Sequence, residues 1–412
     1  MPTFAPPSPA VTSRLSPVRV SAYTAVSALG AGKTAHLDAV VHGRSGLTPL
    51  GAHDFGIAPM AQMLDTWVGR VPGLEVPLPK PWAHWDCRNN RLAWLGLQND
   101  GFMCAVRHAA EQHGAHRVAL VLGSSTASIG ATEDGYKMLA QCGEFPPQPA
   151  NPALHTLHSL TGFVQEALGL RGPAQTISTA CSSSAKAFAS AYRAMHSGLC
   201  DAAVVGGVDS LCLTTLYGFN SLQVLSTDIC RPADAQRNGI SIGEAAGFAI
   251  VEFSDRPGPA LLGYGESSDA HHMSSPHPEG HGALAAMTAA LQRAGLAPHD
   301  IGYVNLHGTG TLANDLAEDK AVCALLGSAT PCSSTKGWTG HTLGAAGILE
   351  AAISLLVLEH GLLPRSLNTR QRDPQLGAAI LMENREQAVA HVLSNSFGFG
   401  GSNCSLLFGV QA

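Results

Sequence analysis

Short runs of apolar, β-branched residues alternate with alanine-rich stretches along most of the chain. The segments 117–122 and 175–178 are typical of buried strands, and the alanine-rich stretch 182–195 predicts a helix. The same alternation continues later, with a strand-like segment at 301–306 and an apolar helical stretch at 348–358. Strands that alternate with helices at this spacing form sheets that helices cover. The sequence therefore predicts an α/β protein with mainly buried sheets.

The alternation occurs twice, once before and once after a turn rich in proline and glycine at 256–259. Because such turns often separate structural units, we expect an N-terminal half over 18–255 and a C-terminal half over 256–412. Residues 1–17 are rich in Pro, Ser and Thr and predict a flexible tail without the apolar core of a signal peptide. No sequence repeat connects the halves, so their similarity is a structural expectation.

The composition argues against several classes of protein. Lys and Arg number 24 and Asp and Glu 30, so the net charge is −6, and without a basic stripe no nucleic acid partner is expected. The 10 cysteines form no C-x-x-C pair, which is typical of free thiols in a reducing cytosol. The apolar stretch 344–363 is interrupted by Glu350 and Glu359, so no membrane span is expected. We expect a cytoplasmic protein without a metal or a cofactor.

The first candidate for chemistry is Cys181, within the segment STACSSS at 178–184. A short predicted strand precedes this segment and a long predicted helix follows it, so the cysteine lies at or near a helix N-terminus. Free N–H groups and the helix dipole favour the thiolate there, and the thiolate is the reactive form of cysteine. The alternative is a small buried cysteine packed at a strand–helix turn.

Two more glycine-rich segments contain histidines near the ends of strands. His307 opens the segment HGTGT directly after the strand-like run 301–306, where α/β sheets place reactive groups. Lys336 and His341 lie five residues apart, just before the helix that contains Glu350. A lysine beside a buried glutamate would form a charge pair that holds the loop. The alternatives are a histidine in an ordinary glycine turn and a tight turn before a helix.

A fourth segment, NSFGFGGSN at 395–403, lies between two predicted strands. Its backbone N–H groups would bind an oxyanion, and the alternative is an ordinary glycine hairpin. One type of reaction, thioester chemistry, needs all four segments. The cysteine takes up an acyl group, two neutral histidines donate hydrogen bonds to an enolate oxygen, and free amides complete an oxyanion hole.

These motifs resemble the elongating β-ketoacyl-acyl-carrier-protein synthases of the thiolase-like superfamily. The resemblance runs from about residue 18 to 409 and is strongest over TACSSS, RPADAQRNGISIGEAAG, YGESSDAHHM, IGYVNLHGTGT, SSTKGWTGHTLGAAG and SNSFGFGGSN. It implies a thiolase-like five-layered αβαβα fold of two similar halves, and a dimer formed through the first half. It also implies an acyltransferase that condenses malonyl-carrier with an acyl-cysteine enzyme, with loss of carbon dioxide. Each condensation elongates a fatty-acid or polyketide-type chain by two carbons.

The resemblance also implies roles for single residues. Cys181 matches the acylated nucleophile, and His307 and His341 match the pair that promotes decarboxylation and stabilises the enolate. Lys336 matches the lysine that supports this pair. Phe399 matches the gate residue whose backbone amide joins that of the cysteine in the oxyanion hole.

Five other positions complete the implied site. Glu350 matches the charge partner of the lysine, and Phe397 is expected to support the site. Thr309 and Thr311 match residues that hold the pantetheine arm of the substrate. Thr126 falls where relatives place a residue that limits the length of the acyl chain. A polar residue at this position favours an unusual acyl group, conjugated or aryl-bearing.

Acyl- and malonyl-loaded carrier proteins are the implied partners. Gln223 lies where many relatives have an arginine that touches the carrier, and Arg88 and Arg91 are candidates to replace it. Charged residues make up only 13% of the chain, which favours an oligomer. We expect a homodimer. The alternative is a specialised ketosynthase of an aryl polyene or polyketide pathway, which could pair with a chain-length-factor-like chain.

Two other classes of protein fit the motifs less well. A non-catalytic partner chain would lack the nucleophile, whereas this chain keeps Cys181, both histidines and Lys336. A degradative thiolase uses a second cysteine as a base near the C-terminus, but Cys404 is predicted inside the final strand. The initiating synthases use Cys, His and Asn, so the histidine at 341 argues against that branch.

Overall fold

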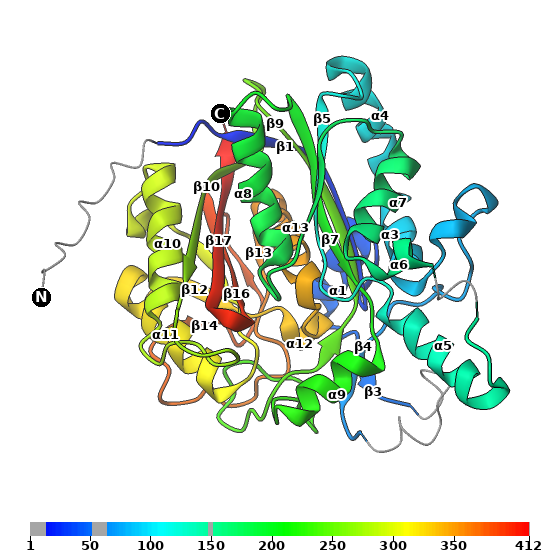
Figure 1. The fold of residues 1–412 in the computed structure, drawn as a ribbon. Coiled ribbons are helices and arrows are strands. Elements are labelled where there is room, and N and C mark those ends of the chain that lie inside the picture. Colours follow the sequence, from blue (N-terminus) through cyan, green and yellow to red (C-terminus); the bar gives the residue numbers. More distant parts are fainter. Residues whose placement is uncertain (1–13, 52–63, 147–150, 412) are drawn as a thin grey trace, which may run out of the picture.

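The computed structural model describes residues 14–51, 64–146 and 151–411. A mixed sheet runs through the molecule and consists of two arrays of strands (Figure 1). The N-terminal array has the spatial order β1-β9-β7-β5-β6. β5 pairs in parallel with β6 and β7, whereas β9 is antiparallel to β7 and β1. These strands are β1 (Val18–Ser27), β5 (Val118–Gly123), β6 (Ala174–Ile177), β7 (Ala202–Asp209) and β9 (Ala245–Glu252).

The C-terminal array repeats this arrangement in the order β10-β17-β16-β11-β12, with β14 added beside β12. β11 is parallel to β12 and β16, and β17 is antiparallel to β16 and β10. When the five strands of each array are numbered by their order along the chain, both arrays therefore have the same spatial order: first, fifth, fourth, second, third. The arrays join where β1 pairs with β10. The strands are β10 (Gly258–Ser268), β11 (Tyr303–Asn305), β12 (Pro331–Ser333), β14 (Ala379–Ile380), β16 (His391–Gly398) and β17 (Ser402–Gln411).

Helices form three layers around the two arrays (Figure 1). The central layer contains α8 and α13, which contact each other and strands of both arrays. Helices α3, α4 and α7 cover the outer face of the N-terminal array, and α10 and α11 that of the C-terminal array. The predicted five-layered αβαβα fold is thereby confirmed. The helices are α3 (Arg88–Leu97), α4 (Phe102–His113), α7 (His158–Leu168), α8 (Ser183–His196), α10 (His281–Ala294), α11 (Leu312–Leu326) and α13 (Ala346–His360).

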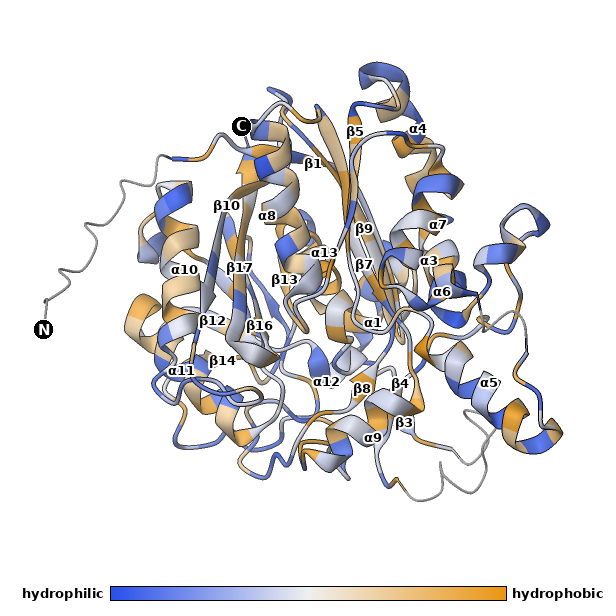
Figure 2. Cartoon of the chain, viewed as in Figure 1, coloured by the Kyte–Doolittle hydropathy of each residue, from blue (hydrophilic) through white to orange (hydrophobic). Residues whose placement is uncertain are grey.

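The central layer explains the low charge of the sequence, because its helices have protein on both sides. The segment Leu343–His360 is long and apolar enough to cross a membrane, but 83% of it is buried inside the protein. Strand β7 is likewise buried along its whole length. Figure 2 shows largely hydrophobic colouring on strands of the N-terminal array such as β5, whereas much of the polar colouring lies on the outer helices and loops. Burial of this apolar surface is the main force that holds the layers together.

The remaining elements lie mostly at one end of the arrays. The sequence did not predict α5 and α9, which lie beside the end of β7 and contact each other. Strands β3, β4 and β8 form a small separate sheet. The elements are α1 (Lys33–His42), α5 (Ile129–Cys142), α6 (Pro152–His155), α9 (Leu213–Ser221), α12 (Lys336–Thr339), β2 (Gly30–Ala31), β3 (Leu47–Pro49), β4 (Trp67–Gly69), β8 (Ile242–Gly243), β13 (Leu362–Leu363) and β15 (Arg385–Glu386).

The predicted flexible tail lies largely outside the described residues, which begin at Arg14. The backbone N–H of Leu15 donates a hydrogen bond to the carbonyl of Arg293 at 2.8 Å. Its side chain packs against the central core cluster. The last residues of this segment therefore contact helix α10 instead of extending into solvent.

Close packing of α10 on β10 leads to a prediction about Gly265. A Cβ atom at this position would lie 1.8 Å from the carbonyl oxygen of Ala286, so the helix would have to move. Overpacking of this kind costs about 1–3 kcal/mol, and we expect Gly265→Ala to lower the free energy of unfolding by that amount. Urea denaturation followed by circular dichroism measures it.

Gly130→Ala is the matched control for this substitution. Gly130 lies in helix α5, and its added Cβ would have its nearest neighbour at 3.9 Å. Because alanine favours a helix over glycine by about 1 kcal/mol, stability should stay the same or rise. Equal losses in the two variants would contradict the described packing of α10 on β10.

Candidate active site

The candidate residues lie where strands of both arrays end. Cys181 follows β6 and precedes α8, and His341 follows β12 and precedes α13. β6 and β12 are the third strands of their arrays, so these two residues occupy similar places in the repeated topology. His307 follows β11, and Phe399 follows β16. The fold thus brings four distant segments together at the carboxyl ends of parallel strands, where α/β proteins commonly bind ligands.

Cys181 occupies a sharp turn between a strand and a helix. The residue before it, Ala180, has a left-handed backbone with φ 53°. The hydroxyl of Ser183 accepts a hydrogen bond from the N–H of Thr179 and donates one to the carbonyl of Ala180. These bonds hold the turn, which directs the cysteine sulfur inward. The sulfur lies 3.0 Å from Nε2 of His341.

Burial makes the thiol of Cys181 a weaker acid than its position before a helix suggests. Removal from water raises its pKa to about 11, although the ammonium of Lys336 lowers it. The backbone N–H groups of Phe399 and of Cys181 itself also lower this pKa, because both donate toward the sulfur. The sequence-based expectation of a favoured thiolate is therefore wrong, since desolvation outweighs the helix terminus. The two amides nevertheless form a pair of donors at the sulfur.

His341 has one ring nitrogen fixed by the backbone. Its Nδ1 accepts a hydrogen bond from the N–H of Leu343 at 3.0 Å, so the neutral ring carries its proton on Nε2. That nitrogen faces the sulfur of Cys181. Burial, assisted by the charge of Lys336, lowers the pKa of His341 well below its usual value. The ring is therefore a neutral hydrogen-bond donor at neutral pH.

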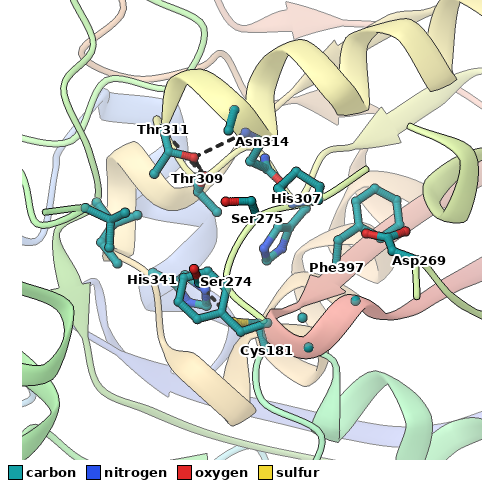
Figure 3. A pocket seen from close by; sticks show the side chains of 18 of the residues that line it. Cys181, Asp269, Ser274, Ser275, His307, Thr309, Thr311, Asn314, His341 and Phe397 are labelled. Carbon is teal, nitrogen blue, oxygen red and sulfur yellow. Dashed lines mark hydrogen bonds between the residues drawn. The ribbon is translucent and has the colours of Figure 1, made fainter. Parts of the chain in front are cut away.

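His307 is held in the same protonation state by a different partner. The ammonium of Lys336 lies 3.4 Å from Nδ1 of His307 and donates to the carbonyl of this residue at 2.5 Å. Burial, followed by the charges of Lys336 and His341, lowers the pKa of His307 well below its usual value. The two rings lie 5.4 Å apart at an angle of 86°. Figure 3 shows both rings beside Cys181 at the cavity.

Lys336 forms a buried ion pair with Glu350, as the sequence indicated. Its Nζ lies 2.5 Å from Oε1 of the carboxylate, and the side chains are 1% and 3% exposed. Burial raises the pKa of Glu350, and the lysine opposes this effect. Ser396 donates to the other carboxylate oxygen at 3.4 Å. A buried ammonium with a paired carboxylate and a ring nitrogen as neighbours is held in one place.

Glu318, in helix α11, was not predicted as a site residue. Its carboxylate accepts hydrogen bonds from the backbone N–H groups of His307 at 2.8 Å and Gly308 at 2.7 Å. Asn395 donates to it at 3.1 Å, and burial raises its pKa to about 7. This residue holds the loop that carries the first histidine. The only sequence signal was an acidic residue in the helix after HGTGT, which resembles an ordinary exposed helix position.

Cys181 lines two cavities, which are called the front and the rear cavity below. The front cavity has a volume of about 100 Å³, and Thr309, Thr311 and Phe397 are among its lining residues (Figure 3). The hydroxyls of the two threonines lie 2.9 Å apart. The ring of Phe397 lies 6.0 Å from that of His307.

The rear cavity is larger, at about 420 Å³, and its lining includes Thr126 and Leu343. Phe219 and Phe399 line both cavities, with ring centroids 5.5 Å apart. These two aromatic side chains therefore separate the front cavity from the rear one. Phe219 belongs to helix α9 and was missed, because no sequence pattern places it near the cysteine.

The sulfur of Cys181 and ring nitrogens of His307 and His341 lie within 4.8 Å of one another. In the described parts of the chain, these three residues are the only group of His, Cys, Asp or Glu side chains close enough to share a metal ion. Sulfur and imidazole suit zinc. To bind a metal through Nε2, however, both rings would have to move their protons to Nδ1. They would then lose the hydrogen bonds from Leu343 and Lys336. The arrangement is better suited to hydrogen-bond donation than to metal binding.

Comparisons with known proteins assign the chain to a family. Residues 86–255 match the N-terminal domain of β-ketoacyl synthase and residues 260–370 match its C-terminal domain. The chain is 34% identical over 317 residues to 3-oxoacyl-[acyl-carrier-protein] synthase 2 of Vibrio cholerae, an alignment that covers 72% of this chain and 77% of the relative. It is 38% identical over 270 residues to the mitochondrial 3-oxoacyl-[acyl-carrier-protein] synthase of Arabidopsis thaliana, covering 60% of this chain and 59% of that relative.

A solved structure is similar over almost the whole chain. It is a ketosynthase from Xenorhabdus doucetiae in complex with its chain length factor, with 38% identity and a TM-score of 0.87. The match covers 96% of this chain and 98% of the other. The chain therefore belongs to the β-ketoacyl synthase family of acyltransferases. The predictions of a thiolase-like fold and of a β-ketoacyl-[acyl-carrier-protein] synthase are confirmed.

The position of Lys336 beside the site leads to a prediction about the reactivity of Cys181. Because the thiol pKa is raised to about 11, alkylation by iodoacetamide should accelerate about tenfold for each unit between pH 7 and 9.5. Lys336→Met removes a charge that favours the thiolate, so alkylation at pH 8 should be about threefold to tenfold slower. Peptide mass spectrometry distinguishes this residue from the exposed Cys104 and Cys142.

Lys320→Met provides the control for loss of a positive charge. Lys320 lies on the surface, where it pairs with Glu279 at 2.7 Å. Alkylation of Cys181 in this variant should be as fast as in the chain without substitutions. If Lys336→Met reacted as fast as the control, the ammonium would have no effect on the thiolate.

Proposed function

We propose that the chain condenses an acyl group on Cys181 with a malonyl group on a carrier protein. The observation that supports this most directly is the meeting of one sulfur with two imidazole Nε2–H donors and two backbone amides. His307 and His341 donate to the same space, and Phe399 supplies one of the amides. A thiol nucleophile, two neutral donors and an oxyanion hole are what a decarboxylative condensation requires.

The first half-reaction transfers the acyl group. The thiolate of Cys181 attacks the thioester carbonyl of the acyl-carrier, and the carrier thiol leaves with the proton that the cysteine lost. The N–H groups of Cys181 and Phe399 bind the oxyanion that forms at the carbonyl. The acyl chain then extends into the rear cavity, past Phe219 and toward Thr126.

The second half-reaction forms the new bond between carbons. The malonyl thioester enters by the front cavity, where Thr309 and Thr311 contact its pantetheine arm. Its bond to the carboxylate breaks, carbon dioxide leaves, and the electron pair forms an enolate. The Nε2–H groups of His307 and His341 bind the enolate oxygen. The enolate carbon then attacks the acyl thioester, and Cys181 leaves as a thiolate from a product that is two carbons longer.

The similar ketosynthase, which is in complex with a chain length factor, supports a specialised acyl group. The rear cavity is lined by Ser125, Thr126, Thr215 and Ser221 beside apolar side chains. All four hydroxyls are hydrogen-bonded within the chain, so the wall needs no polar partner from the substrate. We propose a substrate from a polyene or polyketide type of pathway, in place of an ordinary fatty acyl chain.

The two arginines predicted to contact the carrier protein form ion pairs within the chain. Arg88 pairs with the buried Glu244 at 2.6 Å, and Arg91 pairs with Asp86 at 2.5 Å. Both guanidinium groups are thereby engaged within the chain. Gln223 is exposed and has a left-handed backbone with φ 58°. We propose that the carrier binds near this residue through contacts that depend less on charge, with the reaction taking place in the cytoplasm.

We propose further that the chain acts as a dimer through its N-terminal array. Among the described residues, strand β6 is the edge of this array and pairs only with β5. Helix α5, in the same N-terminal half, exposes Tyr136 by 63% and Met138 by 46%. An unpaired strand edge and apolar side chains are features that a second chain would cover. The similar ketosynthase is bound to a chain length factor, which favours a related chain as the alternative to a second copy.

Intact-mass measurement tests the proposed chemistry. After exposure to a panel of acyl-carriers, the unmodified chain should gain the mass of one acyl group, and digestion should place it on Cys181. Cys181→Ala should gain no mass and should lose condensation by at least about 1,000-fold, because no acyl-enzyme forms. Cys332→Ala, at a buried cysteine of strand β12, is a control that should retain acyl loading. Acylation at another residue, or elongation by Cys181→Ala, would refute the proposal.

Native mass spectrometry tests the proposed assembly. The chain purified alone should form a homodimer, and Tyr136→Glu should weaken it, because a charge would enter the apolar surface of α5. If the chain is instead monomeric alone and dimerises only with a related chain lacking the nucleophile, the heterodimer is the functional form. A monomer that condenses substrates without any partner would contradict both arrangements.

A further inference from the structure

Asp209, the last residue of β7, is a buried carboxylate that the proposed reaction does not use. Its side chain is 0% exposed. Six hydrogen-bond donors from two loops surround it, and no ion pair to it occurs among the described residues. They are Ser124 Oγ at 2.8 Å, Ser125 N at 2.8 Å, Ser125 Oγ at 2.6 Å, Thr126 N at 2.9 Å, Thr126 Oγ1 at 2.8 Å and Gly344 N at 2.6 Å.

Five of these donors belong to the loop after β5, which forms one wall of the rear cavity. Ser125 and Thr126 both line this cavity. Because the hydroxyl of Thr126 donates to Asp209, its methyl group is the part that remains free to face an acyl chain. The carboxylate therefore determines both the position of this wall and the group that the wall presents.

The sixth donor belongs to the loop that follows His341. Gly344 N–H donates to Asp209, and the preceding residue, Leu343, has a left-handed backbone with φ 55°. The N–H of Leu343 is the group that holds Nδ1 of His341. An L-residue rarely adopts this conformation unless its surroundings impose it, and the bond from Gly344 to the carboxylate is such a restraint.

Gly344 also shows how closely the two loops approach the carboxylate. A Cβ atom there would lie 2.7 Å from Oδ2 of Asp209 and 3.1 Å from the backbone nitrogen of Ser125. Only a glycine permits this approach. A buried carboxylate that is stabilised by dipoles alone needs all of its donors in place. Displacement of one loop therefore disturbs the other.

We propose that Asp209 is a positioning residue that fixes the wall of the acyl cavity and the ring of His341 together. This inference rests on the proposed function, because it assigns effects to the acyl cavity and to the donor histidine. The inference adds an energetic coupling between the acyl cavity and His341. An acyl chain that presses on Thr126 acts on the same carboxylate that accepts from Gly344, the residue after Leu343, so acyl-chain fit and enolate stabilisation are linked.

Asp209→Asn tests the coupling, because its amide would direct N–H groups at donors that need an acceptor. Two half-reactions are measured separately on the folded protein. The first is the loading rate of acetyl- against dodecanoyl-carrier, from intact mass. The second is the release of carbon dioxide from malonyl-carrier. Since a small misplacement of a donor costs up to about 100-fold, we expect decarboxylation to fall about tenfold or more. The ratio of the two loading rates should change about threefold or more.

Two other variants separate positioning from a general loss of structure. Gly344→Ala reaches the same contact from the other loop and should reproduce both effects. Glu133→Gln is the matched control, because within the described part of the chain Glu133 accepts hydrogen bonds only from Leu213 N at 3.0 Å and Thr214 N at 2.6 Å, at the start of α9. α9 lines the rear cavity, and its Leu213 and Leu216 share an apolar cluster with Leu343. The hydrogen bonds of Glu133, however, involve neither Asp209 nor the backbone of the His341 loop. This variant should alter the loading ratio and leave decarboxylation unchanged.

Thermal unfolding of each variant accompanies these assays. If both Asp209→Asn and Gly344→Ala lose only stability, with both half-reactions of the folded fraction unchanged, the positioning role is wrong. If decarboxylation falls but the loading ratio does not change, the coupling is wrong. An unmodified chain that neither loads nor decarboxylates overturns the proposed function itself, and the inference with it.

Discussion

The site depends on one buried positive charge. The ammonium of Lys336 is almost fully removed from water and is held by Glu350 on one side and by His307 on the other. Such a charge is costly to bury unless it has an anionic partner, and the pair in turn determines the protonation of its surroundings. It keeps the proton of His307 on the nitrogen that faces the cavity, and it opposes the effect of burial on the thiol of Cys181. Removal of either member would leave the other unpaired in the core.

The repeated topology explains how the groups around this charge meet. Each array places its third strand before a central helix, and both helices lie between the arrays. The turn before α8 presents Cys181, and the loop before α13 presents His341. Because the two helices contact each other, these two turns come within hydrogen-bond distance although 160 residues separate them. Burial of apolar surface on both sides of the central layer supplies the stability that such a strained arrangement needs.

The segments that are regular in sequence could be predicted, and those that depend on distant partners could not. The strand at 118–123 and the helix at 183–196 follow from their own composition and appear within a residue of their expected ends. Helices α3, α4, α5, α7 and α9 were not predicted, because polar residues interrupt them and they lack the alanine- or leucine-rich runs of the predicted helices. Glu318, Phe219 and Asp209 were missed for a different reason. The two carboxylates accept hydrogen bonds from backbone N–H groups, and Phe219 packs against the ring of Phe399. Only the fold brings these partners close to them.

The sequence alone determined the α/β class of the fold and the residue types of the site, whereas the five layers came from the family resemblance. Alternating strands and helices require an α/β core, and a cysteine, two histidines and a lysine in glycine-rich settings indicate thioester chemistry. The tertiary structure decided which nitrogen of each ring carries its proton, how strongly burial opposes the thiolate, and which carboxylates hold the loops. The physical reason is that hydrogen-bond partners and desolvation depend on atoms far apart in the chain. Their positions are set only when the two arrays pack against the central helices.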